Sequence, residues 1–189
     1  VLDPIPGRQV IGMSMVINRG KTIFIADTSI TELPVAEDLV GIARESASSV
    51  KALGFTPRVA FVSYSTFGNP MGERAEKVRE AVAMLDARDD VDFEYEGDMS
   101  VDVAMNPGHK LVYPFSRLTD SANVLVMPAI HSAAIATKLL TSMSRATVIG
   151  PILLGFEKPV QIASLGATVN DIVNLATFAA FDIDKLGHI

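Results

Sequence analysis

A hydroxyl and a carboxylate stand close together near the end of the 189-residue chain, in the segment ASLGATVNDI at 163–172. If the fold brings Ser164 and Asp171 to one crevice, the aspartate could act as a general base toward a thiol or hydroxyl nucleophile. Acyl-phosphate chemistry also calls for a positive charge beside the developing oxyanion, which Leu165 cannot supply. A purely structural alternative is a capping box, because Thr168 precedes Asp171 by the spacing typical of a helix start.

Further candidates for ligand contacts lie in the loops 27–34, 63–70, 128–132 and 150–155, because ligands of α/β folds gather beyond the carboxyl ends of strands. The loop 63–70 offers several hydroxyls, and its Gly68 permits a close approach of the backbone to a phosphate. Capping and turn formation are an alternative use of these hydroxyls. The candidate ligand-binding residues are Asp27, Ser63, Ser65, Thr66, Pro128, His131, Gly150, Pro151 and Ser164.

Asp27 follows an expected strand and could either bind a ligand group or form an ordinary turn. His109, His131 and His188 are scattered without a second ligand at helical spacing, so we expect no metal site built from this chain alone. Cysteine is absent, which excludes disulfides and thiolate sites and suits the reducing cytoplasm. No basic segment followed by an apolar one marks a signal peptide.

The composition bounds the class of protein. With 49% hydrophobic residues the chain can bury a core, whereas its net charge of −6 argues against binding to nucleic acid. The mean hydropathy of +0.33 is high, yet no apolar run approaches the roughly 18 residues that span a bilayer. The surplus of apolar residues therefore indicates a subunit or domain interface, as in a homo-oligomer.

Strand-like and helical patterns alternate along the chain. A hairpin is expected from 10–17 and 22–26, and helices are expected over 36–53, 73–85, 130–140 and 169–181. Further extended segments are expected over 58–62, 91–95, 123–127, 148–155 and 159–163. This alternation predicts an α/β fold with a mainly parallel sheet.

The order of the segments VAFVSYST, EKVREAV, VMPAI and IGPILLGFEKPVQIASLGATVNDIVN resembles the phosphate acetyltransferase and butyryltransferase family over almost the whole chain. The resemblance implies a three-layer α/β sandwich similar to isocitrate and isopropylmalate dehydrogenases, with acyl-CoA and phosphate in a cleft between two lobes. Residues 1–163 would form the second lobe, and residues 164–189 would cross to a first lobe that is mostly missing from the chain. The chain also starts at Val1 without an initiator methionine, which fits a piece of a longer protein.

The resemblance implies that Ser164 and Asp171 occupy the positions of the family's active-site serine and base, whereas its arginine is replaced by Leu165. A second departure lies in the segment PAIHSAA at 128–134, where the active enzymes have a Pro-Asp-Leu-Asn-x-Gly-Asn run. A third lies in the loop 67–70, which is poorer in Gly and Ser. Loss of one oxyanion donor costs about 10²- to 10³-fold in rate, so a working transacetylase is not expected.

These departures resemble the C-terminal transacetylase-like domain of large bacterial NADP-dependent malic enzymes, which oxidatively decarboxylate malate to pyruvate. The resemblance implies a non-catalytic domain that senses acetyl-CoA and forms oligomers, with no cofactor of its own. NADP and the divalent metal, Mg or Mn, would belong to the parent enzyme. One alternative is an active phosphate acyltransferase in which Lys158 or Arg117 replaces the arginine, and another is a purely structural dimerisation domain.

Overall fold

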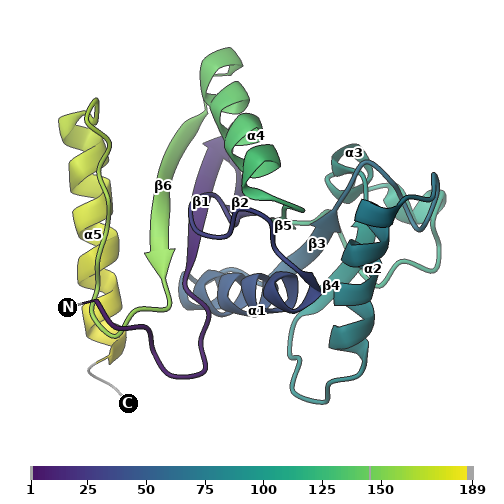
Figure 1. Ribbon diagram of the computed structural model, residues 1–189. Helices are drawn as coiled ribbons and strands as arrows, with labels where there is room; N and C mark the ends of the chain where they lie inside the picture. Colours follow the sequence, from purple (N-terminus) through teal and green to yellow (C-terminus); the bar gives the residue numbers. More distant parts are fainter. Residues whose placement is uncertain (1, 145, 187–189) are drawn as a thin grey trace.

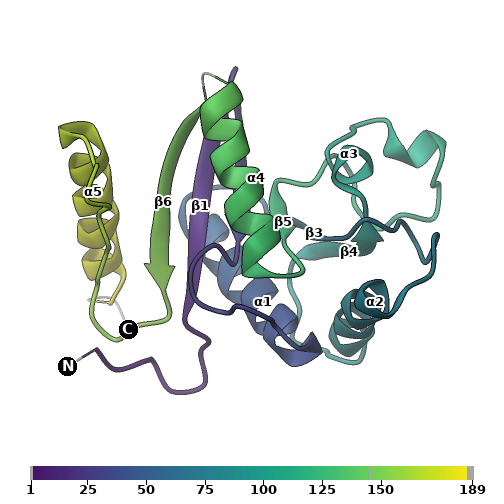
Figure 2. The same ribbon diagram turned by 45° about the horizontal axis from the view of Figure 1, so that its top comes forward.

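The computed structural model describes residues 2–144 and 146–186, with side chains described as far as residue 181. Its centre is a six-stranded sheet with the strand order β4-β3-β5-β2-β1-β6, and α5 stands beside β6 at one end of the sheet (Figure 1, Figure 2). The strands are β1 (Ile11–Asn18), β2 (Lys21–Ala26), β3 (Arg58–Val62), β4 (Glu94–Met99), β5 (Val124–Val126) and β6 (Thr147–Leu154). The helices are α1 (Ala36–Ala52), α2 (Glu73–Asp86), α3 (Val101–Ala104), α4 (Ile130–Met143) and α5 (Val169–Leu186), with a 3₁₀ turn at His109–Leu111.

The sheet is mainly parallel, as the sequence predicts. β2, β5, β3 and β4 pair in parallel, whereas β1 is antiparallel to both of its neighbours, β2 and β6. Every strand except β1 therefore runs in the same direction. The carboxyl ends of β2, β5 and β3 consequently meet at one edge of the sheet, where the loops that follow them begin.

Helices cover both faces of the sheet, which gives three layers. Val59 and Phe61 of β3 pack in the core beneath α1 and α2, whereas Ala60 and Val62 pack in the core beneath α3 and α4. This alternation follows from the geometry of a strand, whose successive side chains point to opposite faces. Because both faces of the central strands are covered, these strands are apolar almost throughout.

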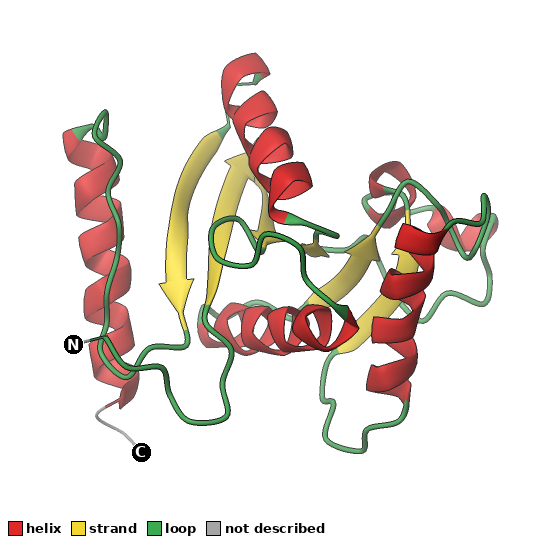
Figure 3. Ribbon diagram, viewed as in Figure 1, coloured by secondary structure: helices red, strands yellow, loops and turns green. Residues whose placement is uncertain are grey.

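Most expected elements are present, including the hairpin and the four long helices (Figure 3). The strand expected at 91–95 is instead Glu94–Met99, because two of its carboxylates are buried and bonded to arginines, which hides the strand from a hydrophobicity pattern. The extended segment expected at 159–163 pairs with no strand. The side chain of Gln161 bonds there to the backbone N–H and C=O of Leu153 at 3.0 and 3.4 Å, in place of a backbone ladder.

Candidate functional site

One pocket between β6, α4 and α5 brings several of the sequence candidates together. Gly150 and Pro151 of β6 line it with Ser164, which precedes α5, and with Asp171 in the first turn of α5. The pocket has a volume of about 230 Å³. Ser164 and Asp171 therefore share one crevice, which is the geometric condition that a catalytic role would require.

Thr168 and Asp171 also form the capping box that their spacing predicts. The backbone N–H and the hydroxyl of Thr168 each donate to Asp171 Oδ2 at 2.8 Å. The N–H of Asp171 donates back to Thr168 Oγ1 at 3.2 Å. The backbone N–H and then the hydroxyl of Thr168 lower the pKa of Asp171, because both hydrogen bonds favour the charged carboxylate. A carboxylate with a lowered pKa is a weaker general base.

The pocket contains no basic side chain among the described residues that line it, and Asp171 is its only charged group. Leu165 is completely exposed and does not line the pocket. An anionic acyl phosphate placed here would meet a carboxylate and no cation. The electrostatics of the described pocket therefore oppose the charge that develops in acyl transfer to phosphate.

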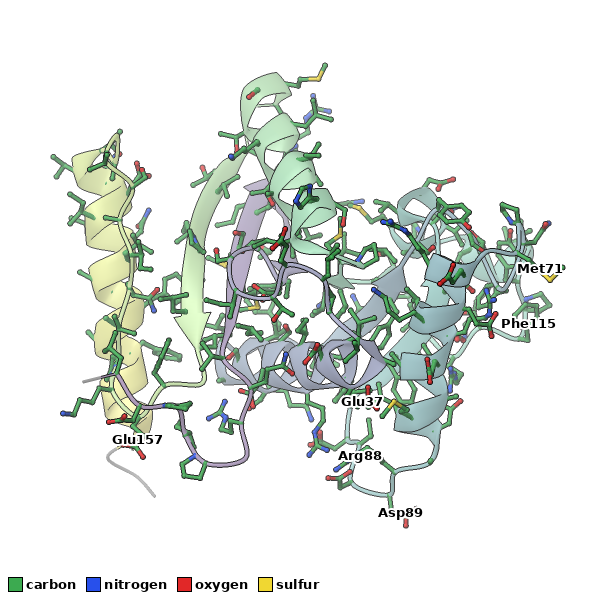
Figure 4. The ribbon with its side chains drawn as sticks, in the orientation of Figure 1. Glu37, Met71, Arg88, Asp89, Phe115 and Glu157 are labelled. Atoms are coloured by element: carbon green, nitrogen blue, oxygen red, sulfur yellow. The ribbon has the colours of Figure 1, made fainter. Side chains whose placement is uncertain are left out.

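The two basic residues considered as replacements for the missing arginine lie elsewhere. Arg117 donates to Glu96 Oε1 at 3.0 Å, forms an ion pair with Asp86 and stacks over the Tyr95 ring, so it is committed to β4 and α2. Lys158 is exposed and does not line the pocket. Its neighbour in the sequence lies beside the end of α5 that is far from the helix start, as the label of Glu157 in Figure 4 shows.

Asp27 lies just beyond β2 and is almost fully buried. Its Oδ1 accepts hydrogen bonds from the backbone N–H groups of Gly12 and Ser29 at 2.9 and 2.8 Å, and its Oδ2 accepts from Thr31 at 2.7 Å. Both carboxylate oxygens are therefore used to hold the loop after β2. Of its two expected roles, turn formation is the one that these hydrogen bonds show.

The hydroxyl-rich loop after β3 is fixed by β4 and by the residues that follow β4. Thr66 Oγ1 lies 3.0 Å from both the hydroxyl and the backbone N–H of Ser100. Buried Asp98 accepts from the N–H of Gly68 at 2.9 Å and from Arg79 at 3.3 Å. The structure thus accounts for most of this loop by internal hydrogen bonds.

Ser63 and Ser65 differ from the rest of that loop. The backbone N–H of Ser65 approaches Ser63 Oγ at 3.4 Å. Ser65 Oγ is fully buried, and no hydrogen-bond partner for it exists among the described residues. An unpaired buried hydroxyl costs stability, so Ser65 is the polar group of this loop that its own fold does not explain.

Pro128 lies in the loop that leads from β5 into α4, whereas His131, expected in that loop, lies in the first turn of α4. The N–H of Ile130 donates to the carbonyl of Glu32 at 3.3 Å, so this loop meets the loop after β2. His131 Nε2 lies 3.9 Å from Glu32 Oε1, with both side chains largely exposed. The loop after β2 and the start of α4 are thus neighbours at the carboxyl edge, whereas Pro128 and His131 do not line the Ser164 pocket.

Gly150 and Pro151 were expected within an extended segment, 148–155, and also within a candidate ligand loop, 150–155. Both lie inside β6, so the extended assignment is confirmed and the loop assignment is wrong. The pairing of β6 with β1 shifts register between Met13 and Met15, which is where this Gly-Pro pair interrupts the ladder. Proline is tolerated at this position because β6 is an edge strand, so its outer side lacks a strand that would need the missing N–H.

The described histidines do not form a metal centre. His109 is buried, and its ring nitrogens lie 2.9 Å from the carbonyl of Asn106 and 3.1 Å from the hydroxyl of Ser116. His188 lies outside the described residues. In the described part of the chain no three His, Cys, Asp or Glu residues are grouped as metal ligands, and no helix combines the length and apolarity needed to cross a bilayer.

Sequence reasoning missed seven of the eleven described residues that line the Ser164 pocket, three of them on helices α4 and α5. Asn174 and Leu175 follow Asp171 on the same face of α5, and Thr141 reaches the pocket from α4. The helical spacing from Asp171 to Asn174 and Leu175 is a signal that could have identified the first two. Thr141 gives no such signal, because only the packing of α4 beside β6 brings it there.

Comparisons with known proteins identify the family of this chain. The family model described as "Phosphate acetyl/butaryl transferase" matches residues 1–180, nearly the whole chain. The chain belongs to the phosphate acetyl/butyryltransferase family. The solved structure of a phosphotransacetylase from Streptococcus pyogenes superposes on this chain with a TM-score of 0.90 at 29% identity, covering 97% of this chain and 57% of that one.

Two curated relatives of this family member carry different names. The NADP-dependent malic enzyme of Rhizobium meliloti is 54% identical over 96% of this chain but only 24% of its own length. The phosphate acetyltransferase of Buchnera aphidicola is 40% identical over 81% of this chain and 22% of its own length. The chain thus spans about a quarter of the length of each of these two relatives.

Proposed function

We propose that the chain is a non-catalytic domain of an NADP-dependent malic enzyme, where it senses acetyl-CoA and helps to form the oligomer. The observation that carries this proposal is the Ser164 pocket, which keeps the family's serine and aspartate but has no cation in its described lining. Binding can outlast catalysis, because recognition of an acyl group relies on apolar and backbone contacts.

The volume of the Ser164 pocket suits the acetyl end of acetyl-CoA, the proposed effector. A volume of about 230 Å³ can take an acetyl thioester, with the remainder of the CoA lying outside. Val148 and Ile149 supply apolar wall, while Ser164 and Asn174 supply hydroxyl and amide groups that can bond to a carbonyl. Neutral donors of this kind fix the orientation of a ligand without the charge stabilisation that turnover needs.

The attribution to a malic enzyme rests on similarity to the Rhizobium meliloti protein over almost the whole chain. In this proposal oxidation of malate with NADP and Mg or Mn belongs to other segments of a longer cytoplasmic polypeptide. Residues 1–163 form the second lobe, and residues 164–189 cross toward a first lobe. Exposed Val169, Ile172 and Val173 on α5 supply an apolar face for that contact.

Oligomer formation is supported by a second apolar face. Ile135, Leu139 and Met143 of α4 are more than half exposed and recur every four residues, so they lie in a row along one side of the helix. A row of this kind on a helix surface is typical of a contact with another helix. We assign it to a second copy of the chain.

A binding measurement with a matched pair of variants tests the sensing role. Calorimetry should detect acetyl-CoA binding to the chain, and Asn174→Leu should weaken binding about tenfold or more by filling the pocket and removing a polar partner. Asn170→Leu makes the same change one turn earlier, at an exposed residue that does not line the pocket. Equal binding by both variants, or no binding by the unaltered chain, contradicts the assignment.

A functional measurement tests the allosteric part, which requires acetyl-CoA to change the malate site through different affinities for two states. In the intact malic enzyme, acetyl-CoA should inhibit NADPH production, and Asn174→Leu should relieve that inhibition. Inhibition that is unchanged by deletion of this domain rules out the sensing role.

The competing function is an active phosphate acyltransferase. It predicts release of CoA from acetyl-CoA and phosphate at enzymatic speed, abolished by Asp171→Ala. We expect no turnover above background, because the described pocket offers no cation to the developing anion. A chain that neither turns over nor binds acetyl-CoA would instead be a structural dimerisation domain.

A further inference from the structure

Two adjoining pockets lie at the end of the sheet where β2, β3 and β5 begin. The larger has a volume of about 380 Å³ and includes Arg19 and Lys21 from the hairpin turn. The smaller, of about 240 Å³, includes Arg58. The two share Lys21, Ile23 and Met105 as lining residues, so they are parts of one groove. None of their lining residues belongs to the Ser164 pocket.

The groove is basic in a chain of net charge −6. No aspartate or glutamate is among the described residues that line it. Within the described part of the chain Arg19 and Lys21 form no ion pair. Arg58 donates its Nε to the carbonyl of Ser121 at 2.8 Å, which leaves its positive charge uncompensated by a carboxylate. Three cations therefore face one groove without internal counter-charges.

The backbone at Arg19 gives an independent reason to assign it a role. Arg19 and Gly20 have φ of 49° and 77°, the left-handed pair of a tight hairpin turn. Asparagine followed by glycine is the preferred sequence for this turn, because asparagine adopts positive φ more readily than other side chains. Arginine at position 19 is less favourable for this turn than asparagine would be. Such departures from local preference gather at functional sites.

Much of the remaining lining of the larger pocket is apolar. Val16, Ile23, Met105 and Leu140 come from β1, β2, the residue after α3 and the second half of α4, so four separate elements build this wall. A methionine in such a wall adapts to ligands of different shape. A lining that combines cations with aliphatic groups matches a ligand that is anionic at one end and apolar at the other.

We propose that this groove binds a small amphipathic anion, a phosphate monoester or carboxylate on a short apolar body. Arg19 and Lys21 hold the anionic group, and the Val16, Ile23, Met105 and Leu140 wall takes the apolar body. The volume of the larger pocket lies within the range of about 300–1,000 Å³ typical of small-molecule sites. The site is separate from the acetyl-CoA pocket and does not depend on the function proposed above.

Titration of the isotope-labelled chain with defined probes tests this site. Butyl phosphate and butyrate should shift the amide resonances of the hairpin and the methyl resonance of Met105, and the tighter of the two identifies the anionic group. Inorganic phosphate and 1-butanol each carry half of the recognised chemistry and should bind at least about tenfold more weakly. Equal shifts with 1-butanol would reduce the site to an apolar pocket and overturn the proposal.

A pair of double variants separates local contacts from net charge. Arg19→Asn with Lys21→Gln removes two charges while favouring the turn, so binding should fall at least about tenfold with an equal or higher melting temperature. Arg74→Gln with Lys77→Gln removes the same charge from α2, which contributes no residue to the groove, and should leave binding unchanged.

The same experiment distinguishes a ligand from another copy of the chain. If the hairpin and Met105 resonances shift with protein concentration alone, and the probes do not compete with that shift, a subunit contact occupies the groove and the proposal fails. Unchanged binding by the hairpin double variant also overturns it. Probe binding that requires Arg19 and Lys21 and does not vary with protein concentration supports the proposal.

Discussion

Thr168 and Asp171 hold each other at the start of α5, with the Thr168 hydroxyl 2.8 Å from Asp171 Oδ2 and the Asp171 N–H 3.2 Å from Thr168 Oγ1. Asp171, which we propose corresponds to the family's base, is therefore a helix cap in this chain. Its charge is stabilised by groups that are present whether or not a ligand is bound. The hydrogen bonds of Asp171 thus hold the start of α5, although the same side chain also lines the Ser164 pocket.

Replacing Thr168 by alanine should raise the pKa of Asp171 toward the ordinary value near 3.9, because one of its hydrogen bonds is lost. The lowered pKa of Asp171 stabilises the fold at pH values above its pKa in the unfolded chain. This stabilisation is lost as the pH falls through its pKa in the folded chain. Thr168→Ala should therefore flatten the pH dependence of stability below about pH 4. Carboxyl carbon resonances followed against pH measure the shift. Thr168→Ser keeps the hydroxyl and should keep the lowered pKa.

Replacing Arg117 by methionine should destabilise the chain by about 2 kcal/mol, since Glu96 is left buried without its cation. This is less than for a fully buried pair because the guanidinium is itself half exposed. The exposed partner gives a control, and Asp86→Asn should cost less than about 1 kcal/mol. Urea unfolding measures both values. If Glu96→Gln does not relieve part of the Arg117→Met effect, the buried charge is not the cause.

The pKa of Tyr95 should lie above the ordinary value for a tyrosine. Burial raises its pKa first, and the hydrogen bond to Asp86 at 2.8 Å adds to this by favouring the protonated phenol. The folded state therefore gains stability that is fully present below about pH 10 and is lost as pH rises through the raised pKa. Ultraviolet titration of tyrosinate checks this. If Tyr95→Phe leaves the highest-pH part of the ultraviolet titration unchanged, the prediction is contradicted.

The unpaired hydroxyl of Ser65 predicts an unusual sign for its removal. In the absence of ligand, Ser65→Ala should leave stability unchanged or raise it by up to about 1 kcal/mol, because a buried polar atom without a described partner is removed. Thr66→Val should instead cost about 1 kcal/mol through loss of the bonds to Ser100. Thermal unfolding measures both changes. A clear loss of stability in Ser65→Ala would show that its hydroxyl has a partner in solution.

The fold was predictable wherever local pattern and burial agree. β3 and β5 are apolar runs buried on both faces, and α1 has a regular apolar stripe, so their types could be assigned from the sequence. The predicted position of β4 was wrong because Glu96 and Asp98 are buried in this strand. Their partners Arg117 and Arg79 are distant in sequence, and no periodicity could reveal those bonds.

The site was predictable only in part. Ser164 and Asp171 share a pocket, and the Thr168–Asp171 cap followed directly from spacing. Gly150 and Pro151 fell within both an expected extended segment and an expected loop, and the sequence could not decide between the two because a Gly-Pro pair usually marks a turn. Its acceptance there depends on the order of the strands in the sheet, which is a property of the assembled fold.

The side-chain bonds of Gln161 have a consequence for self-association. β6 is the last strand of the sheet, and its second half is strongly apolar, a combination that invites addition of a strand from another molecule. Gln161 occupies the backbone groups of Leu153 that an incoming strand would use, and α5 lies alongside. Helix α5 and the segment before it thus cover the edge of β6. Their detachment would expose this edge to pairing with a strand of another molecule.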